Sequence, residues 1–188
     1  MAYASTSEIK RYLGITSTDD DALLATLAES ATDIIDNLTG RTFAASADAT
    51  KYHTVDNVDG DTLWFDSDVA SITSITNGDG VAVASTNWRT LPRNDTPYYA
   101  VELKDDSTVT WDTDSGDIAV VGRWAYSTTP PPVISQVCTR ITAYLYRQKD
   151  NMGELDRALI AGNTTLLPAE LPKDIILLLA TYKRTGGG

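Results

Sequence analysis

The chain has 188 residues, which favours one domain, or one domain that carries a large insertion. Its 15 basic and 26 acidic residues give a formal net charge of −11, which argues against a protein that holds nucleic acid through its phosphates. No window approaches the ~20 apolar residues of a membrane span, and the N-terminus has no signal-peptide stretch. The single cysteine, Cys138, cannot form an internal disulfide, so we expect a buried thiol in a protein made in a reducing cytoplasm.

The first 45 residues predict two helices. Ser5–Ser7 offer N-caps for a short helix that Gly14 ends. A second helix is expected to begin at Thr18, whose hydroxyl forms a capping box with Asp21. Apolar residues at helical spacing form one face of this second helix: Leu24, Leu27, Ala28, Ala31, Ile34, Ile35 and Leu38.

The stretch DIIDNLTGRTF, residues 33–43, breaks the helical pattern abruptly. We expect Gly40 to adopt the left-handed conformation that ends a helix, because glycine does so without steric cost. Phe43 is expected to fold back on the last turn, so that Gly40 and Phe43 form a structural corner. This interpretation leaves Arg41 available as a surface or interface residue.

Residues 46–128 show short β-branched and aromatic segments, which are typical of antiparallel strands. Turn signals such as Asp59-Gly60 and Asn77-Gly78 separate them. The four tryptophans, at positions 64, 88, 111 and 124, all lie in this part, and we expect them in the core or on a sheet face. The expected strands are 52–56, 62–66, 69–75, 81–85, 99–104, 109–112 and 117–126.

Residues 129–188 return to helical patterns. Pro130–Pro132 suit the entrance of a helix whose buried face comprises Ile134, Val137, Cys138, Ile141 and Leu145. A short segment at 154–161 follows, and Pro172 begins a last helix. There Ile175–Leu179 are apolar around the whole circumference, which predicts burial on more than one side. A neighbouring subunit or another partner would cover the helix, and the alternative is that it fills the core of its own subunit. The candidate interface residues are Arg41, Arg140, Tyr144, Arg147, Ile176, Leu179, Tyr182, Lys183 and Arg184.

The sequence contains no convincing catalytic or metal-binding motif. VDNVDGD, residues 55–61, fails as a calcium loop because Val55 takes the first ligand position, and it is better interpreted as a solvated hairpin turn. His53 is the only histidine, so a histidine-based zinc site or a serine triad lacks partners. Neither glycine-rich phosphate-binding fingerprint is present. We therefore expect no enzyme activity, no metal and no cofactor.

These patterns predict an α+β fold: a helical bundle, built from an N-terminal helix pair and C-terminal helices, with an inserted antiparallel β domain. The helical connector domain comprises residues 1–45 and 129–188, and the inserted β domain comprises residues 46–128. The ends of an inserted domain are expected to lie close together.

Several segments resemble the head-to-tail connector (adaptor) proteins of tailed bacteriophages. SEIKRYLG (7–14) and DALLATLAESATDIIDNLTGRTF (21–43) look like the N-terminal helices of that family, which end in a TGRxF-like corner. PPPVISQVCTRITAYLYRQKDN (130–151) and the terminal helix ending in Tyr182, Lys183 and Arg184 are similar to its helical remainder. The departure is the middle of the chain, because compact family members join their helices by a shorter connection.

The resemblance implies a homo-oligomeric, dodecameric ring in the virion neck, below the portal protein. Its partners would be the portal and a tail or stopper protein, and DNA would pass through the channel without sequence-specific binding. The protein would be made in the host bacterial cytoplasm, with no membrane partner. The acidic charge is compatible with a channel that repels phosphate. The alternative is an oligomeric β-sandwich module that binds a carbohydrate or a receptor.

Overall fold

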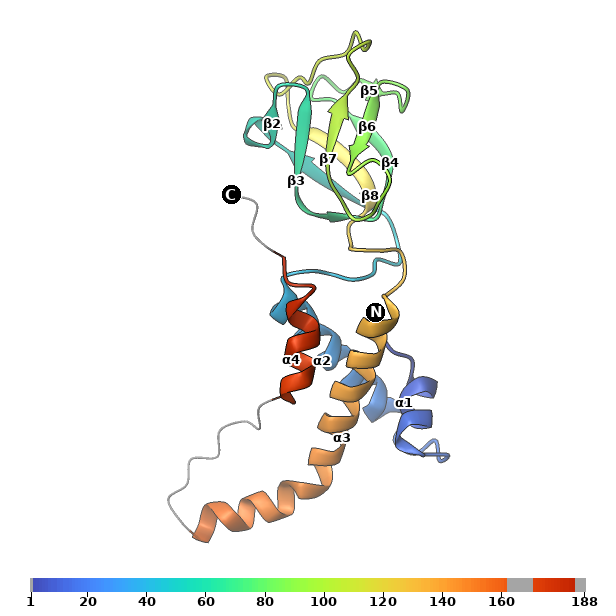
Figure 1. Cartoon of the computed structure of the whole chain (residues 1–188), viewed down its shortest axis with the longest axis vertical. Coiled ribbons are helices and arrows are strands. Elements are labelled where there is room, and N and C mark those ends of the chain that lie inside the picture. Colours follow the sequence, from blue (N-terminus) through green and yellow to red (C-terminus); the bar gives the residue numbers. More distant parts are fainter. Residues whose placement is uncertain (1, 162–170, 185–188) are drawn as a thin grey trace. The chain divides into compact units, whose positions relative to one another are not determined.

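The computed structural model describes residues 2–161 and 171–184 and divides the chain into two compact units (Figure 1). One unit combines Met1–Gly40 with Pro130–Gly188 and contains the helices. The other, Arg41–Thr129, contains two antiparallel sheets. The chain is therefore a mixed α+β protein, as the sequence predicts.

The helical unit begins with α1 (Thr6–Leu13) and α2 (Asp21–Thr39). Ser5 and Glu8 form a capping box at the start of α1, and Gly14 ends it with φ 74°. The expected start of the second helix at Thr18 is wrong, because residues 18–20 form a turn and α2 begins at Asp21. Asp20 takes the N-cap position of α2 and makes no side-chain cap hydrogen bond.

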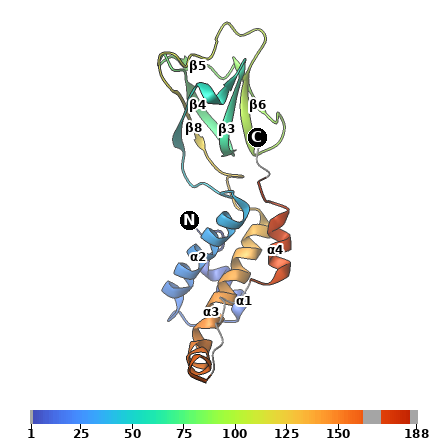
Figure 2. The same cartoon turned by 90° about the vertical axis from the view of Figure 1, so that its left-hand side faces the viewer.

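The unit continues with α3 (Pro132–Ala161) and α4 (Lys173–Ala180). The expected separate segment at 154–161 is instead the end of α3. Helices α1 and α4 each pack against both α2 and α3. In Figure 1 they lie on opposite sides of α3, and Figure 2 shows α3 between α2 and α4. The core between the helices includes Ile9, Leu24, Ile35, Ile134, Ile141 and Ile175, all fully buried.

The burial of Cys138 and Leu38 can be compared with the buried helix faces that the sequence predicts. Cys138 is buried as predicted, and burial raises the pKa of its thiol. Leu38 was expected on the buried face of α2 but is exposed, while Thr39 is buried in its place. The Thr39 hydroxyl donates a hydrogen bond to the Ile35 carbonyl, so a polar side chain is accommodated in the last turn.

The β unit consists of two four-stranded antiparallel sheets, with strand orders β1-β8-β4-β5 and β2-β3-β7-β6. Side chains from both sheets form one core that includes Leu63, Phe65, Ile75, Val101 and Ile118. A 3-10 turn, Val55–Asn57, follows β1. The strands are β1 (Ala49–His53), β2 (Val58–Asp59), β3 (Thr62–Val69), β4 (Ser71–Thr76), β5 (Ala82–Val83), β6 (Trp88–Leu91), β7 (Tyr98–Leu103) and β8 (Ile118–Arg123).

Two expectations for the β unit are wrong. Residues 109–112 form no strand: the Asn77 side chain donates to the Thr110 carbonyl and accepts from the Asp112 N–H, both at 2.9 Å. A side-chain amide thus satisfies backbone groups that a neighbouring strand would otherwise pair. Conversely, β6 (Trp88–Leu91) pairs with β7 although it is not among the expected strands.

The two ends of the β unit lie side by side. Tyr126 N–H donates to the Thr42 carbonyl at 2.8 Å, and Ala44 and Ser127 form a parallel bridge. The chain therefore enters and leaves this unit at one place, as expected for an insertion. Within the described residues, no helix is long and apolar enough to cross a membrane.

Candidate assembly surfaces

The corner at the end of α2 is closed by the C-terminal segment. Gly40 has φ 66°, and its N–H donates to the Asp36 carbonyl at 2.8 Å. The Arg184 N–H donates to the Thr39 carbonyl at 2.8 Å, which satisfies one of the carbonyls that a helix leaves unpaired at its end. Of the predicted interface residues here, Lys183 is exposed, whereas Tyr182 and Arg184 are half-buried.

Helix α4 buries one side and exposes the other. Ile175 and Leu179, four residues apart, are buried against the helical unit, so the expectation of Leu179 as an interface residue is wrong. Ile176 is 45% exposed, Leu177 70% and Leu178 38%. The exposed stripe at spacings of three and four residues, hereafter the α4 ridge, comprises Lys173, Ile176, Leu177 and Ala180.

The candidate interface residues on α3 are Arg140, Tyr144 and Arg147, and they are partly engaged within the helical unit. Arg140 forms an ion pair with Asp174, and this hydrogen bond holds the pKa of the Asp174 carboxyl below its usual range. Both side chains are at least partly solvated, so the pair orients α4 on α3 more than it stabilises the fold. Tyr144 is half-buried and Arg147 is exposed, so Arg147 is the most accessible of the three predicted residues on this face.

A groove between α1 and the start of α3 was missed by the sequence analysis. It has a volume of about 500 Å³ and lies on the side of the helical unit opposite α4. In the sequence, the only indication of this groove is that three residues of α1, at positions 8, 11 and 12, share one helix face. All three are exposed in the structure. This α1/α3 groove is lined by Glu8, Arg11 and Tyr12 of α1 and by Pro132, Ser135 and Thr139 of α3.

Arg41 and Phe43 lie inside the β unit. Arg41 forms an ion pair with Asp68 at 2.6 Å, and the two side chains are only 18% and 10% exposed. Its guanidinium also lies over the Tyr126 ring, 5.5 Å from the centroid. Arg41, expected as a surface or interface residue, is thus engaged by Asp68 and Tyr126. Phe43 is fully buried and packs against Tyr126, with ring centroids 5.6 Å apart.

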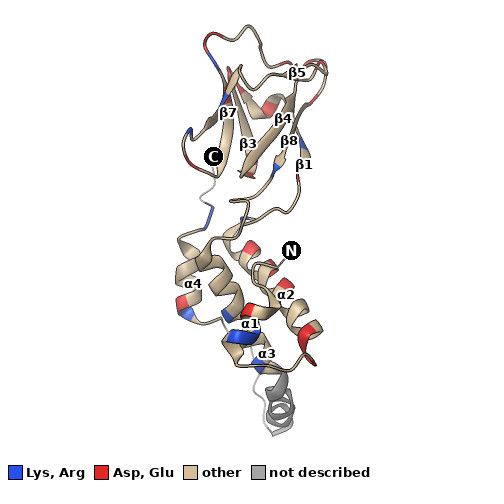
Figure 3. Ribbon diagram, turned by 90° about the vertical axis from the view of Figure 1, so that its right-hand side faces the viewer, with Lys and Arg blue, Asp and Glu red and all other residues tan. Residues whose placement is uncertain are grey.

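Charged residues are unevenly divided between the two N-terminal helices (Figure 3). Helix α1 carries Glu8, Lys10 and Arg11, whereas α2 has no basic residue and exposes Glu29 and Asp33. Lys10 reaches the start of α2, where its Nζ lies 2.7 Å from Asp21. Asp21 is also stabilised by its position in the first turn of α2, because the helix dipole favours a negative charge there.

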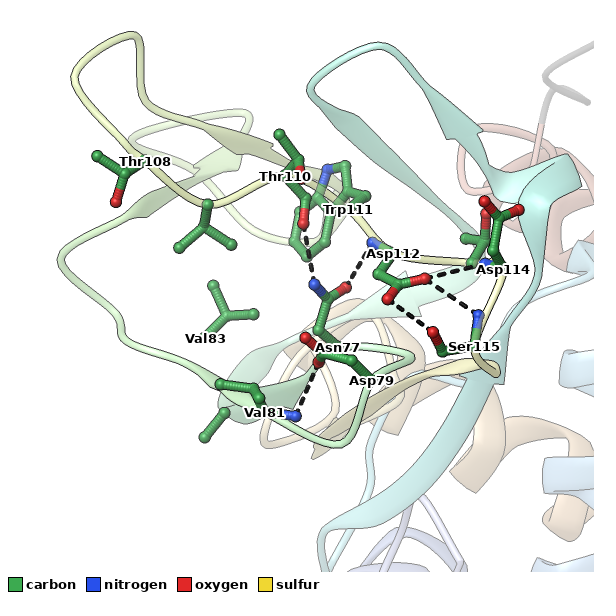
Figure 4. Close-up of a pocket in the computed structure, with 13 residues that line it drawn as sticks. Asn77, Asp79, Val81, Val83, Thr108, Thr110, Trp111, Asp112, Asp114 and Ser115 are labelled. Atoms are coloured by element: carbon green, nitrogen blue, oxygen red, sulfur yellow. Dashed lines mark hydrogen bonds between the residues drawn. The ribbon is translucent and has the colours of Figure 1, made fainter.

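A second hollow lies at one end of the β unit (Figure 4), with a volume of about 620 Å³. The Asp112 carboxylate faces it but accepts hydrogen bonds from Asp114 N–H and from the Ser115 N–H and hydroxyl. These bonds, those from Ser115 foremost, lower the pKa of Asp112, so this carboxyl is a poor proton donor. The arrangement stabilises a turn, because all three hydrogen bonds close on residues within three positions of Asp112.

His53 is buried between Phe65 and Trp124, with ring centroids 5.3 and 5.6 Å away. Among the described residues neither ring nitrogen has a hydrogen-bond partner, and burial lowers the pKa of the imidazole. The ring is therefore a neutral core residue. Among residues 2–161 and 171–184, no cluster of three or more His, Cys, Asp or Glu side chains is placed to hold a metal ion.

The N-terminal part of the chain matches a known protein family. Residues 3–72 match the phage gp6-like head-tail connector protein family, which confirms the resemblance for this segment. The matched segment includes α1, α2, the Gly40 corner and the first strands of the β unit. A search of curated proteins gave no match.

Solved structures match nearly the whole chain. A chain from the neck of an empty GTA particle, computed with C6 symmetry, superposes with a TM-score of 0.66 at 16% identity, covering 99% of this chain and 93% of that one. A chain from the neck of a native GTA particle, computed with C12 symmetry, gives 0.64 at 18%, with coverage of 97% and 91%. A chain from the virion of a native gene transfer agent particle gives 0.62 at 19%, with coverage of 99% and 93%. At these identities the likeness is one of fold.

Proposed function

We propose that the chain is a structural head-to-tail connector of a tailed phage or a related particle, and that its copies form a ring in the neck. The observation that carries this proposal is the match over both units: the neck chains share the helical unit and the β unit, not the helices alone. The connector-family match at residues 3–72 supports it independently.

The proposed ring is dodecameric and lies below the portal, where it extends the DNA channel and joins capsid to tail. The C12 symmetry used for the neck of the native GTA particle supports the subunit number. The formal charge of −11 fits a channel through which DNA slides, because carboxylates repel phosphate at short range. The partners are then neighbouring copies, the portal, and a tail or stopper protein.

The two units have different roles in this proposal. The helical unit, Met1–Gly40 with Pro130–Gly188, is the connector domain that makes the ring. The β unit, Arg41–Thr129, is an insertion that the chain enters and leaves at one place, next to Thr42 and Tyr126. The connector-family match at residues 3–72 supports a role in packing and docking for the chain.

Deleting the gene from its phage or particle tests this function. We expect filled heads and separate tails in the lysate, because the joint between them is missing, and joined particles when the wild-type chain is supplied in trans. Normal particles that adsorb poorly to cells would instead support a receptor-binding role. Normal, fully infectious particles would refute both functions.

One observation favours the alternative of a ligand-binding β module. Trp64 and Tyr99 stack on the surface of the β2-β3-β7-β6 sheet, with ring centroids 5.8 Å apart and planes 12° apart, and both are nearly half exposed. Aromatic faces of this kind bind sugars or apolar side chains. A glycan-binding assay with wild type and Trp64→Ala separates the alternatives, because a connector requires no glycan affinity.

A further inference from the structure

Two unlike surfaces of the helical unit lie on opposite sides of it. The α4 ridge presents the exposed side chains of Ile176 and Leu177, whereas the α1/α3 groove is a hollow between α1 and the start of α3. Helices α4 and α1 lie on opposite sides of α3 in Figure 1. A closed ring with one subunit type requires such a pair, because each copy must offer one surface to the copy before it and a different one to the copy after it.

We propose that copies of the chain join head to tail, with the α4 ridge of one copy seated in the α1/α3 groove of the next. The inference deepens the proposed ring by naming the two surfaces that meet, and it rests on that proposal. The occupant of the groove is a second copy of this chain.

The spacing of charged and apolar groups on the two surfaces matches. On α4, Lys173 precedes Leu177 by four residues, and on α1, Glu8 precedes Tyr12 by four residues. Each interval is about 6 Å along a helix axis. A single placement of α4 along α1 therefore sets the ammonium of Lys173 against the carboxylate of Glu8 and the Leu177 side chain against the Tyr12 ring.

The state of Glu8 agrees with this pairing. The N–H and the hydroxyl of Ser5 both donate to Glu8 Oε2, at 2.8 and 2.7 Å, and these bonds lower the pKa of the Glu8 carboxyl. The carboxylate is therefore charged and held in place at neutral pH, before a neighbour arrives. A fixed charge costs less side-chain entropy when it pairs.

The apolar part of the contact has a clear physical benefit. Leu177 is 70% exposed and Tyr12 53%, so both leave apolar surface in water within a single copy. Each Å² of that surface removed from water contributes about 25 cal/mol. The Pro132 ring, which lines the groove, adds rigid apolar surface without side-chain entropy to lose.

Cysteine cross-linking of the full-length protein tests the contact. We expect the double variant Tyr12→Cys/Leu177→Cys to give a ladder of disulfide-linked oligomers under mild oxidation, because every copy then links to two others. A mixture of the two single variants should give dimers only, and each single variant alone should give none. Cys138 is buried and does not compete. Val81→Cys, exposed in the β unit, is the control and should not link to Leu177→Cys.

The outcomes are distinguishable. Self-linking of Leu177→Cys or of Tyr12→Cys alone would overturn the inference, because like surfaces would then meet. Absence of a ladder would also overturn it, and electron microscopy of wild type then decides whether rings remain and the proposed function stands. As a second measurement, Leu177→Asp should reduce ring formation about tenfold or more while tryptophan fluorescence stays unchanged.

Discussion

Arg41→Ala should destabilise the β unit strongly, although arginines at helix ends are usually tolerant of substitution. In the structure Arg41 pairs with Asp68 at 2.6 Å, and the Asp68 side chain is only 10% exposed. Removing the guanidinium leaves that carboxylate buried without its counter-charge. It also removes the cation–π contact with Tyr126.

The magnitude follows from the burial of both partners. Breaking a buried ion pair by removing one member costs about 3–5 kcal/mol, and the lost cation–π contact adds about 0.5–1 kcal/mol. The Arg41 side chain is 18% exposed, so water screens the pair in part. We therefore expect a loss of about 3 kcal/mol in the free energy of unfolding. The double variant Arg41→Met/Asp68→Leu should recover most of it, because no unpaired charge remains.

Urea unfolding followed by tryptophan fluorescence measures this effect. All four tryptophans lie in residues 41–129, so the signal reports on the β unit alone. Arg123→Ala, which removes a more exposed ion pair with Asp48 at 3.5 Å, is the matched control and should cost less than 1 kcal/mol. If Arg41→Ala costs no more than Arg123→Ala, the pair with Asp68 has no structural role and Arg41 returns as an interface candidate.

Four further outcomes are expected. Gly40→Val should lower the free energy of unfolding by about 1 kcal/mol or more, seen in the helical circular dichroism, because φ is 66° at that position; an unchanged melting curve would contradict this. Gly78→Ala should prevent folding of the β unit, since a Cβ would lie 2.2 Å from the Gly116 carbonyl oxygen; native tryptophan fluorescence in this variant would refute the close approach. The pKa of His53 is lowered in the folded state, so protons bind preferentially to the unfolded chain. The free energy of unfolding therefore falls as the pH drops below about 6.5. In urea titrations, His53→Phe should lose less stability than wild type between pH 7.5 and 5.5. Truncation after Lys173 should leave a folded β unit but abolish ring assembly and portal binding, and co-sedimentation of the truncated chain with portal at wild-type stoichiometry would contradict this.

Helix ends were predictable where their chemistry is local. The Ser5–Glu8 box, Gly14 and Gly40 each act within a few residues of the helix that they cap. The start of α2 was misplaced because Thr18 and Asp21 have the spacing of a capping box, yet the Asp21 N–H donates to the Thr18 carbonyl in a turn. The spacing of Thr18 and Asp21 alone does not distinguish a threonine that caps a helix with its side chain from one that takes part in a turn through its carbonyl.

Strand pairing and side-chain partners were less predictable, because they depend on contacts distant in the sequence. Asp68, the partner of Arg41, lies 27 residues away, and β6 is defined only by its ladder with β7. Every residue of Ile175–Leu179 is apolar, so the sequence pattern does not distinguish the buried side of this helix from its exposed side. In the structure Leu179 faces inward and Leu177 outward. The α1/α3 groove was not predictable because it forms only where α1 and α3, which are distant in the sequence, pack together.

Electron cryo-microscopy of the full-length protein mixed with its portal tests the central claim most directly. The account predicts a twelve-subunit ring coaxial with the portal, an open central channel, and α4 of each copy against α1 and α3 of the next. A protein that remains monomeric and leaves the portal bare would contradict the connector function.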